Sequence, residues 1–175
     1  QMRYLDNTAI HQRGVASTVL MERAANGLFT ACEDVLGTIK GKRAVVFCGS
    51  GNNGGDGVAV ARLLHEQGAE VRALLTGRRE KMTDDCAEME RRLEAAGGAL
   101  EDFDPASDEQ RRAVQHADVL VDAIFGIGLN AEVRGRAADA IDWMNESAAP
   151  VIAADIASGV ETDTGRVLGC AVQAA

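Results

Sequence analysis

Short apolar segments that alternate with helical patterns are the feature that most constrains the fold of this chain. Residues 44–48 (Ala-Val-Val-Phe-Cys) are apolar and β-rich and lie between loop residues, as is typical of a strand covered on both faces. Similar segments are found at 70–75, 118–122 and 150–155, and helical patterns are found at 17–35, after 57, at 83–96, from 107 onward and at 137–144. This alternation predicts βαβ units, and therefore an α/β fold with a mostly parallel central sheet and helices on both faces.

Residues at the ends of two helical patterns support these boundaries. Thr83 is expected to cap the helix that Gly97 and Gly98 end. Ser107 and Gln110 are three residues apart and predict a capping box at the start of a shorter helix.

Length and composition limit the classes of protein to which the chain can belong. Its 175 residues fit one domain, and 46% hydrophobic and 26% charged residues are typical of a globular chain. With 18 basic against 27 acidic side chains the net charge is −9, which argues against a nucleic-acid partner. The apolar runs are too short to cross a membrane and no signal peptide opens the chain, so we expect a cytoplasmic protein.

The cysteines give no sign of a metal site or a disulfide framework. Cys32, Cys48, Cys86 and Cys170 are widely scattered, with no C-x-x-C spacing. A structural zinc site or a network of disulfides needs clustered or regularly spaced ligands. We therefore expect these side chains to be small buried hydrophobes in a reducing compartment.

Glycine and polar residues follow three of the predicted strands. They lie at 49–57 (Gly-Ser-Gly-Asn-Asn-Gly-Gly-Asp-Gly), at 122–129 (Asp-Ala-Ile-Phe-Gly-Ile-Gly-Leu) and at 155–159 (Asp-Ile-Ala-Ser-Gly). Ligands of open α/β sheets bind outside the carboxyl ends of the strands. The coincidence of three such segments at one edge of the sheet predicts a binding site there.

The glycine-rich segment 49–57 is ambiguous by itself. Gly49, Gly51 and Gly54 formally match the dinucleotide fingerprint, but residues 76–79 (Thr-Gly-Arg-Arg) provide no acidic residue at the end of the second strand. An ordinary nicotinamide dehydrogenase is therefore disfavoured, and no Gly-Lys-Ser/Thr marks a Walker A loop. Five glycines that lead into a helix permit positive φ angles and close backbone approach to a phosphate, and the alternative is a tight turn that only connects strand to helix.

Four segments together resemble the YjeF N-terminal family. The most specific is Asn-Asn-Gly-Gly-Asp-Gly at 52–57, and 20–24 (Leu-Met-Glu-Arg-Ala), 122–128 and 155–159 match in the same order. The resemblance implies a Rossmann-like three-layer αβα sandwich. It also implies an NAD(P)H-hydrate epimerase, which interconverts the R and S epimers of NADHX and NADPHX at C6 for repair of nicotinamide cofactors.

The resemblance also implies roles for individual residues. The substrate-binding residues would be Asn52, Asn53, Gly54, Gly55, Asp56, Gly126, Ile127, Gly128, Leu129, Asn130, Ala131, Glu132 and Asp155. A potassium ion would be held by Asn53, Asp122 and Ser158, whose oxygens are hard ligands. Asp155 would be the catalytic acid or base. The alternatives are capping of the following turns by Asp122 and Ser158, and an Asx turn in which Asp155 accepts from the N–H groups of residues 157 and 158.

The chain departs from the family pattern at three places. Ala157 stands where the family usually has Pro, and Ala25 where it commonly has Gly. A further strand is expected to start near Val172, so residues 1–175 are expected to be a single domain that is incomplete at its C-terminus. The family further implies a homo-oligomer and an ADP- or ATP-dependent dehydratase, fused or separate.

Two other functions stay open. A non-catalytic nucleotide-binding or scaffold module of the same fold would not need Asn53, Asp122, Asp155 and Ser158 together, and another nucleotide-dependent enzyme would be recognised by a different bound metal or nucleotide. Arg78, Arg79 and Lys81 follow the second strand, where a 2′-phosphate often lies, although a solvated basic loop is the simpler interpretation.

Overall fold

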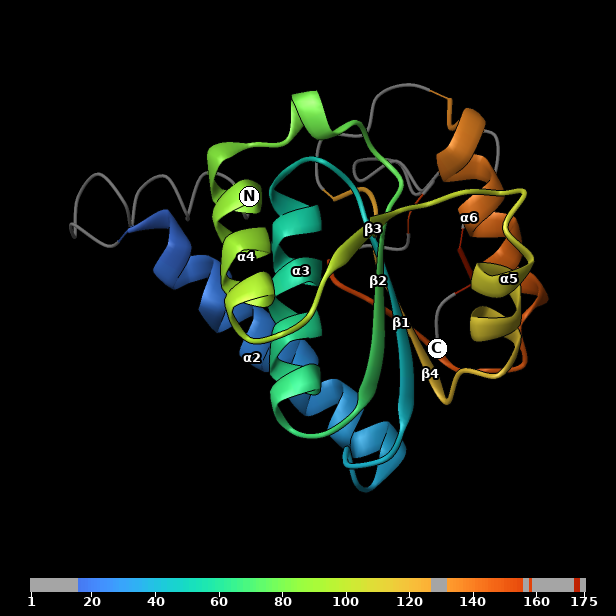
Figure 1. Ribbon diagram of the computed structural model, residues 1–175, viewed down its shortest axis with the longest axis horizontal. Helices are drawn as coiled ribbons and strands as arrows, with labels where there is room; N and C mark the ends of the chain where they lie inside the picture. The colour runs from blue at the N-terminus through green and yellow to red at the C-terminus, as the bar shows by residue number, and fades with distance from the viewer. Residues whose placement is uncertain (1–15, 127–131, 156–157, 159–171, 174–175) are drawn as a thin grey trace.

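The computed structural model of the protein describes residues 16–126, 132–155, 158 and 172–173. Within these residues, five parallel strands form one sheet in the order β3-β2-β1-β4-β5 (Figure 1). The strands are β1 (Arg43–Cys48), β2 (Glu70–Leu75), β3 (Leu100–Asp102), β4 (Val119–Ala123) and β5 (Val151–Ala153). The predicted α/β fold with a parallel sheet is confirmed.

Helices cover both faces of this sheet and make three layers. The helices α2 (Ser17–Leu36), α3 (Asn52–Glu66) and α4 (Asp84–Ala95) pack on one face, and α5 (Asp108–Gln115) and α6 (Gly135–Glu146) on the other (Figure 1). A 3-10 turn, η1 (Arg79–Lys81), links β2 to α4. No helix in the described ranges is long and apolar enough to cross a bilayer.

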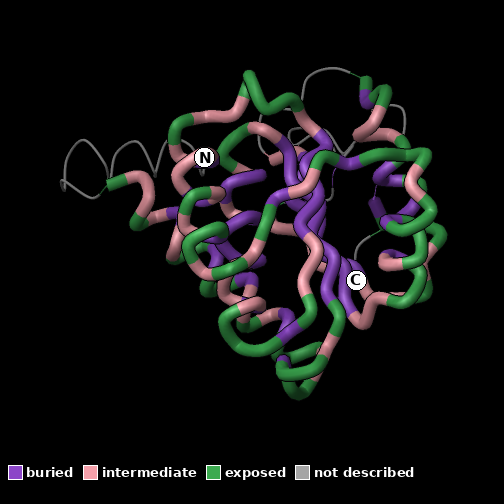
Figure 2. Tube along the Cα trace, in the orientation of Figure 1, coloured by how far each residue is buried: buried purple, intermediate pink, exposed green. Residues whose placement is uncertain are grey.

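The central strand β1 distributes its side chains to two hydrophobic cores. Val46 and Cys48 face the core under α2, α3 and α4, whereas Val45 and Phe47 face the core under α5 and α6. The second core is built on aromatic contacts, since Phe103 meets both Phe47 and Trp143 edge to face, with ring centroids 5.8 and 4.9 Å apart. Figure 2 shows the buried residues along the sheet and the inner helix faces. Because both faces of the sheet are buried, the polar strand ends meet at its carboxyl edge.

The glycine-rich segment is more helical than the sequence predicts. Helix α3 begins at Asn52 after the cap residue Gly51, so three of the five glycines lie inside the helix. None of the five uses the positive φ that glycine permits, since the described glycines with a positive φ lie elsewhere. Four of them, all but Gly51, are closely packed: a Cβ on Gly54 would lie 1.8 Å from the carbonyl oxygen of Gly49, and one on Gly57 would lie 2.5 Å from Cβ of Ala123.

Three smaller predictions also need correction. The strand β3 was not predicted, and the strand that the sequence places at 118–122 is therefore the fourth in the chain. The capping box is half formed: Ser107 Oγ accepts from Gln110 N, but the Gln110 side chain accepts from the N–H of Asp104 instead. Val172 is not in a strand, and its N–H donates to the Ser158 carbonyl oxygen at 2.8 Å.

Candidate functional site

A buried carboxylate at the end of β4 is the centre of the polar edge. Asp122 is fully buried, and its Oδ2 accepts from the N–H of Ser158 at 2.7 Å, while its Oδ1 accepts from the Ser158 hydroxyl. The same Oδ1 accepts from the N–H of Ile124 at 3.3 Å, and the Ser158 hydroxyl oxygen accepts from the N–H of Phe125 at 2.9 Å. The ends of β4 and β5 are therefore tied together through one carboxylate and one hydroxyl.

The protonation of Asp122 is set by two opposing effects. Burial in the sheet disfavours the charged form and raises the pKa of Asp122, whereas the hydrogen bonds from Ser158 and Ile124 lower it. Burial prevails, so the pKa lies above the ordinary value. The alternative role of Asp122, capping of the turn that follows it, is present in the bond from the N–H of Ile124.

Asn53 brings the glycine-rich segment to the same place. Its side chain lies against Gly126, where an added Cβ would be 3.2 Å from both Cβ and Cγ of Asn53. Its Nδ2 is buried without a hydrogen-bond partner among the described residues. A buried amide nitrogen without a partner is uncommon in folded proteins, so this nitrogen is a position that a further hydrogen-bond partner can fill.

The first turn of α3 is open to solvent on one side and fixed on the other. Gly51 and Asn52 are exposed, and Gly51 has no side chain to cap the N–H groups of the turn. The Thr83 hydroxyl donates to Oδ1 of Asn52 at 2.8 Å and so holds this residue to the start of α4. On the inner side, a Cβ on Gly55 would lie 2.6 Å from Sδ of Met21. Unpaired N–H groups at a helix N-terminus favour an anion.

The remaining predicted site residues divide into described and undescribed ones. Asp155 is exposed two residues beyond β5 and forms no hydrogen bond or ion pair with another described residue, so its Asx turn with residue 158 is not formed. Asp56 is half-buried in α3, and Glu132 is exposed and pairs with Arg134 at 2.9 Å. The residues Ile127, Gly128, Leu129, Asn130, Ala131 and Ala157 lie outside the described part of the chain.

The sequence analysis missed Arg136, which reaches this edge from the first turn of α6. Its guanidinium donates to the carbonyl oxygen of Gly77 at 2.5 Å and to that of Phe103 at 3.3 Å. It therefore ties α6 to the ends of β2 and β3. One signal was present in the sequence: an arginine in the first turn of a helix opposes the helix dipole and needs another reason to be there.

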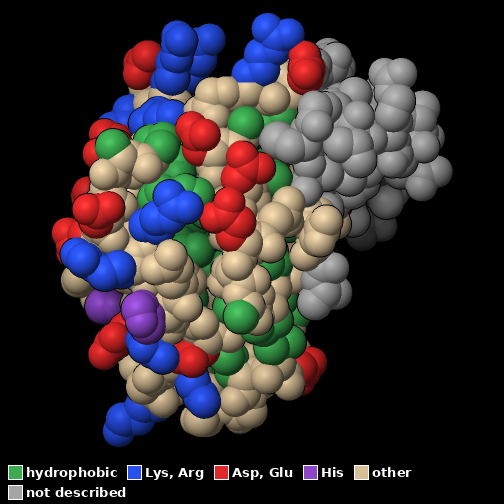
Figure 3. Space-filling model, turned by 90° about the vertical axis from the view of Figure 1, so that its right-hand side faces the viewer, with side chains coloured by type: hydrophobic (Ala, Val, Ile, Leu, Met, Phe, Trp, Pro, Cys, Tyr) green, Lys and Arg blue, Asp and Glu red, His purple; other side chains and the backbone are tan. Residues whose placement is uncertain are grey.

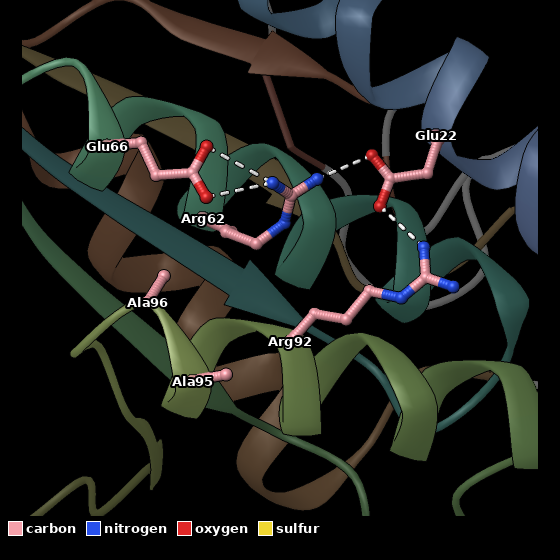
Figure 4. Close-up of a pocket in the computed structure, with 6 residues that line it drawn as sticks. All are labelled: Glu22, Arg62, Glu66, Arg92, Ala95 and Ala96. Carbon is pink, nitrogen blue, oxygen red and sulfur yellow. Dashed lines mark hydrogen bonds and ion pairs between the residues drawn. The ribbon is translucent and has the colours of Figure 1, made fainter.

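A second polar region lies away from this edge, between α2, α3 and α4. It is a hollow of about 360 Å³ lined by Glu22, Arg62, Glu66, Arg92, Ala95 and Ala96. In Figure 4, the Glu22 carboxylate lies between the two guanidinium groups, 2.6 Å from Arg62 and 3.0 Å from Arg92. Its charges neutralise one another, and it shares no residue with the predicted site.

The distribution of surface charge and the protonation of the buried thiols further limit the kinds of site to consider. Figure 3 shows acidic and basic side chains interspersed on the face that it presents. Cys32, Cys48 and Cys86 are buried and free, while Cys170 lies outside the described residues. Burial raises the pKa of Cys32 and of Cys86 to about 11 and also raises the pKa of Cys48, so these thiols stay protonated at neutral pH. The described residues contain no cluster of three His, Cys, Asp or Glu side chains suited to a metal ion.

Comparison with solved structures supports the architecture. The crystal structure of the yeast protein ynu0 matches with a TM-score of 0.84 and 21% sequence identity, over 99% of this chain and 75% of that chain. This likeness establishes the fold.

Comparison of sequences identifies the family. The NAD(P)H-hydrate epimerase of Limosilactobacillus fermentum is 42% identical over 99% of this chain and 79% of its own length. The bifunctional NAD(P)H-hydrate repair enzyme Nnr of Salinibacter ruber is 36% identical over 99% of this chain, which spans 34% of that longer protein. Residues 17–175 match the family described as YjeF-related protein N-terminus. The chain therefore belongs to the YjeF-related N-terminal family.

Proposed function

We propose that this chain is an NAD(P)H-hydrate epimerase domain, an isomerase that interconverts the R and S epimers of NADHX and NADPHX. The observation that carries the proposal is the Asp122–Ser158 pair at the edge of the sheet, with the Asn53 side chain against Gly126 and with Asp155 exposed after β5. The relatives that match the chain over 78–79% of their own length are named as epimerases.

The substrate would lie across this edge with its phosphates at the first turn of α3. The open N–H groups after Gly51 suit a pyrophosphate, and the exposed Asn52 lies beside them. Residues 126–132 are proposed to contribute contacts to the dinucleotide, and Asp56 to contribute from α3. The hydrated nicotinamide ring would then reach the ends of β4 and β5, where Asp155 stands.

A potassium ion fits the donor set at the ends of β4 and β5. Asp122, Ser158 and Asn53 offer carboxylate, hydroxyl and amide oxygens, which are hard ligands for a monovalent cation. Rotation of the Asn53 amide would exchange its orphaned nitrogen for the oxygen, and a bound cation would also offset the burial of the Asp122 charge. Such an ion would supply positive charge near the substrate. Its loss is expected to lower epimerisation, which a titration with potassium chloride against choline chloride would measure.

Asp155 is the residue that we assign to proton transfer. Loss of the C6 hydroxyl is assisted by the lone pair of the ring nitrogen, and the Asp155 carboxyl would donate a proton to the departing oxygen. Water then adds to either face of the ring and returns a proton to the Asp155 carboxylate. Since the Asp122 carboxylate is fully buried and accepts hydrogen bonds from Ser158 and Ile124, the exposed Asp155 is the better placed acid and base.

The test is Asp155→Asn. The amide cannot transfer a proton, so we expect epimerisation to fall by at least a hundredfold, the usual size of general acid–base catalysis. Interconversion is followed by chromatography of purified NADHX epimers, and the binding of the substrate is measured in parallel. Because Asp155 is exposed, stability should not change. A folded variant with wild-type activity would overturn the assignment.

The alternative function is a non-catalytic binding module of the same fold. It predicts that the wild-type protein does not accelerate epimerisation above the spontaneous rate, with or without potassium. The match to one third of a bifunctional enzyme further supports the proposal that residues 1–175 form one domain to which a dehydratase can be fused. A homo-oligomer in the cytoplasm remains part of the proposal, and sedimentation of the purified protein would test the oligomer.

A further inference from the structure

Two arginines meet at Gly77, the second residue after strand β2. Arg78 follows Gly77 in the chain and is exposed, and the Arg136 guanidinium donates to the Gly77 carbonyl oxygen at 2.5 Å. Arg136 comes from the far side of the sheet, in the first turn of α6. Helix dipoles disfavour a cation at that position, so the charge is placed there against the local electrostatics.

Neither arginine is neutralised by a carboxylate in the described part of the chain. Arg78 and Arg136 form no ion pair with another described residue, and the recorded partners of Arg136 are two carbonyl oxygens. The neighbouring Arg79 is different, because its guanidinium lies 2.5 Å from Glu90 and 3.0 Å from Asp102. In a chain with 27 acidic and 18 basic residues, two cations near one peptide without a carboxylate partner in the described ranges are suited to bind an anion.

This pair of arginines lies next to the start of α3. A Cβ on Gly77 would be 2.7 Å from the backbone nitrogen of Ser50, and the N–H of Thr83 donates to the Ser50 carbonyl oxygen at 3.0 Å. The segment from β2 to α4 therefore wraps around the turn that leads into α3. On the other side of that turn lie β4 and the Asp122–Ser158 pair, because β1 separates β2 from β4 in the sheet.

The direction of the substrate follows from this order. With the nicotinamide end at β4 and β5 and the pyrophosphate at α3, the adenosine end of the dinucleotide extends toward β2; this step rests on the proposed function. An acidic residue at the end of β2 would hold the ribose hydroxyls of NAD, whereas an arginine there accommodates a 2′-phosphate. Here the strand is followed by Thr76, Gly77 and Arg78.

We propose that Arg78 and Arg136 form a subsite for the 2′-phosphate of the adenosine ribose, so that the domain prefers NADPHX to NADHX. Arg78 is exposed and able to contact the phosphate directly. Arg136 holds the Gly77 peptide in place and adds positive charge beneath the phosphate. Arg79 has no part in binding because Glu90 and Asp102 already occupy its guanidinium.

The first experiment measures binding without any reaction. Adenosine 2′,5′-bisphosphate and ADP are titrated against the protein by calorimetry, and the first is expected to bind at least tenfold more tightly. Arg78→Ala is expected to lose roughly tenfold to a hundredfold of affinity for the bisphosphate, the range for removal of a hydrogen bond to a charged group. ADP binding should not change. Arg112→Ala, an exposed arginine on α5 that forms no ion pair with another described residue, is the matched control and should behave as wild type.

The second experiment separates the subsite from the reaction. Arg78→Ala should lower kcat/KM for NADPHX by the same factor and leave NADHX unchanged. A protein that binds the bisphosphate through Arg78 but epimerises nothing would refute the proposed function and keep the subsite. Equal binding of the two nucleotides by wild type, or an equal loss of both substrates in Arg78→Ala, would overturn the subsite.

Arg136 needs a variant that keeps its charge. Arg136→Lys retains the cation but loses the paired contacts to Gly77 and Phe103, whereas Arg136→Gln loses both. The preference for the bisphosphate over ADP should therefore fall less in Arg136→Lys than in Arg136→Gln. An unchanged preference in both variants would remove Arg136 from the subsite.

Discussion

The molecule has two polar regions that use charge in opposite ways. In the hollow between α2, α3 and α4, Glu22 is shared by Arg62 and Arg92, and Glu66 completes the pairing of Arg62 (Figure 4). At the carboxyl edge of the sheet the groups are left incomplete. Asp122 is desolvated, the Asn53 amide nitrogen has no partner among the described residues, and two arginines face carbonyl groups or solvent.

The comparison shows that the volume of a hollow does not locate function. The hollow of about 360 Å³ contains four charged side chains, but they pair with one another and hold three helices together. One group there is also orphaned, the Nε of Arg62, yet the other guanidinium nitrogens of that residue are bound. Polar groups that the chain itself leaves unsatisfied are the better indicator, because they await a partner from outside.

The largest expected effect is on the packing that forms the edge. In Gly54→Ala the new Cβ would lie 1.8 Å from the backbone oxygen of Gly49, so either α3 or the preceding turn must shift. We expect a loss of about 3 kcal/mol in the free energy of unfolding, the upper range for overpacking, together with loss of epimerisation. Urea denaturation and the epimer assay measure the two effects.

Gly27→Ala is the control for this change. Gly27 lies inside α2 with no atom within 4 Å of an added Cβ, so the variant should gain up to about 1 kcal/mol from its better helix propensity. A Gly54→Ala protein as stable as Gly27→Ala would mean that the glycines at the edge are not needed for packing and serve the ligand alone.

The next largest effect is expected from replacing Asp122, the buried hydrogen-bond acceptor at the edge. Asp122→Asn replaces a carboxylate that accepts hydrogen bonds from Ser158 and Ile124 by an amide, whose nitrogen can only donate. The change should lower the free energy of unfolding by about 1–3 kcal/mol. Burial raises the pKa of Asp122 in the folded protein, so between the ordinary Asp pKa of about 4 and the raised value the folded state binds more protons. In that window the wild type loses stability as the pH rises, and the Asn variant does not.

The penalty of Asp122→Asn should therefore be largest at low pH and shrink as the pH rises. Unfolding in urea at a series of pH values, in buffers without potassium, measures it. Asp139→Asn, an exposed aspartate on α6, is the control and should show no such trend. A penalty for Asp122→Asn that grows with pH would show that the hydrogen bonds outweigh the burial.

The sequence predicts the sheet well because its strands are covered by helices on both faces. The segments at 44–48 and 70–75 are apolar enough to be recognised, and the structure extends or matches them within one residue. Strand β3 was missed because it has three residues, of which only Leu100 is apolar and buried, and it pairs with β2 alone. A pattern of this length carries too little information to distinguish a strand from a loop.

The site was predicted only in part, and for a physical reason. Asp122 lies near the end of β4 and Ser158 follows β5, its neighbour in the sheet, so the rule for parallel strand ends brings them together although they are 36 positions apart. Arg136 comes from a helix, and its contact with Gly77 joins residues that are 59 positions apart in the sequence. Such a contact depends on the length and rotamer of one side chain, which no pattern of strands and helices specifies.

The smallest expected effect is in the hollow, and it tests whether that region is structural. Glu22→Gln removes the ion pairs to Arg62 and Arg92, whose side chains are 16% and 38% exposed. Because solvent screens such pairs, we expect a loss of about 1 kcal/mol in stability, smaller at high salt, and no change in epimerisation. Glu88→Gln, which removes pairs to Arg91 and Arg92 on the surface of α4, should lose less. If Glu22→Gln instead abolished epimerisation at full stability, the hollow would be part of the site, and self-neutralised charge would no longer mark a structural region in this fold.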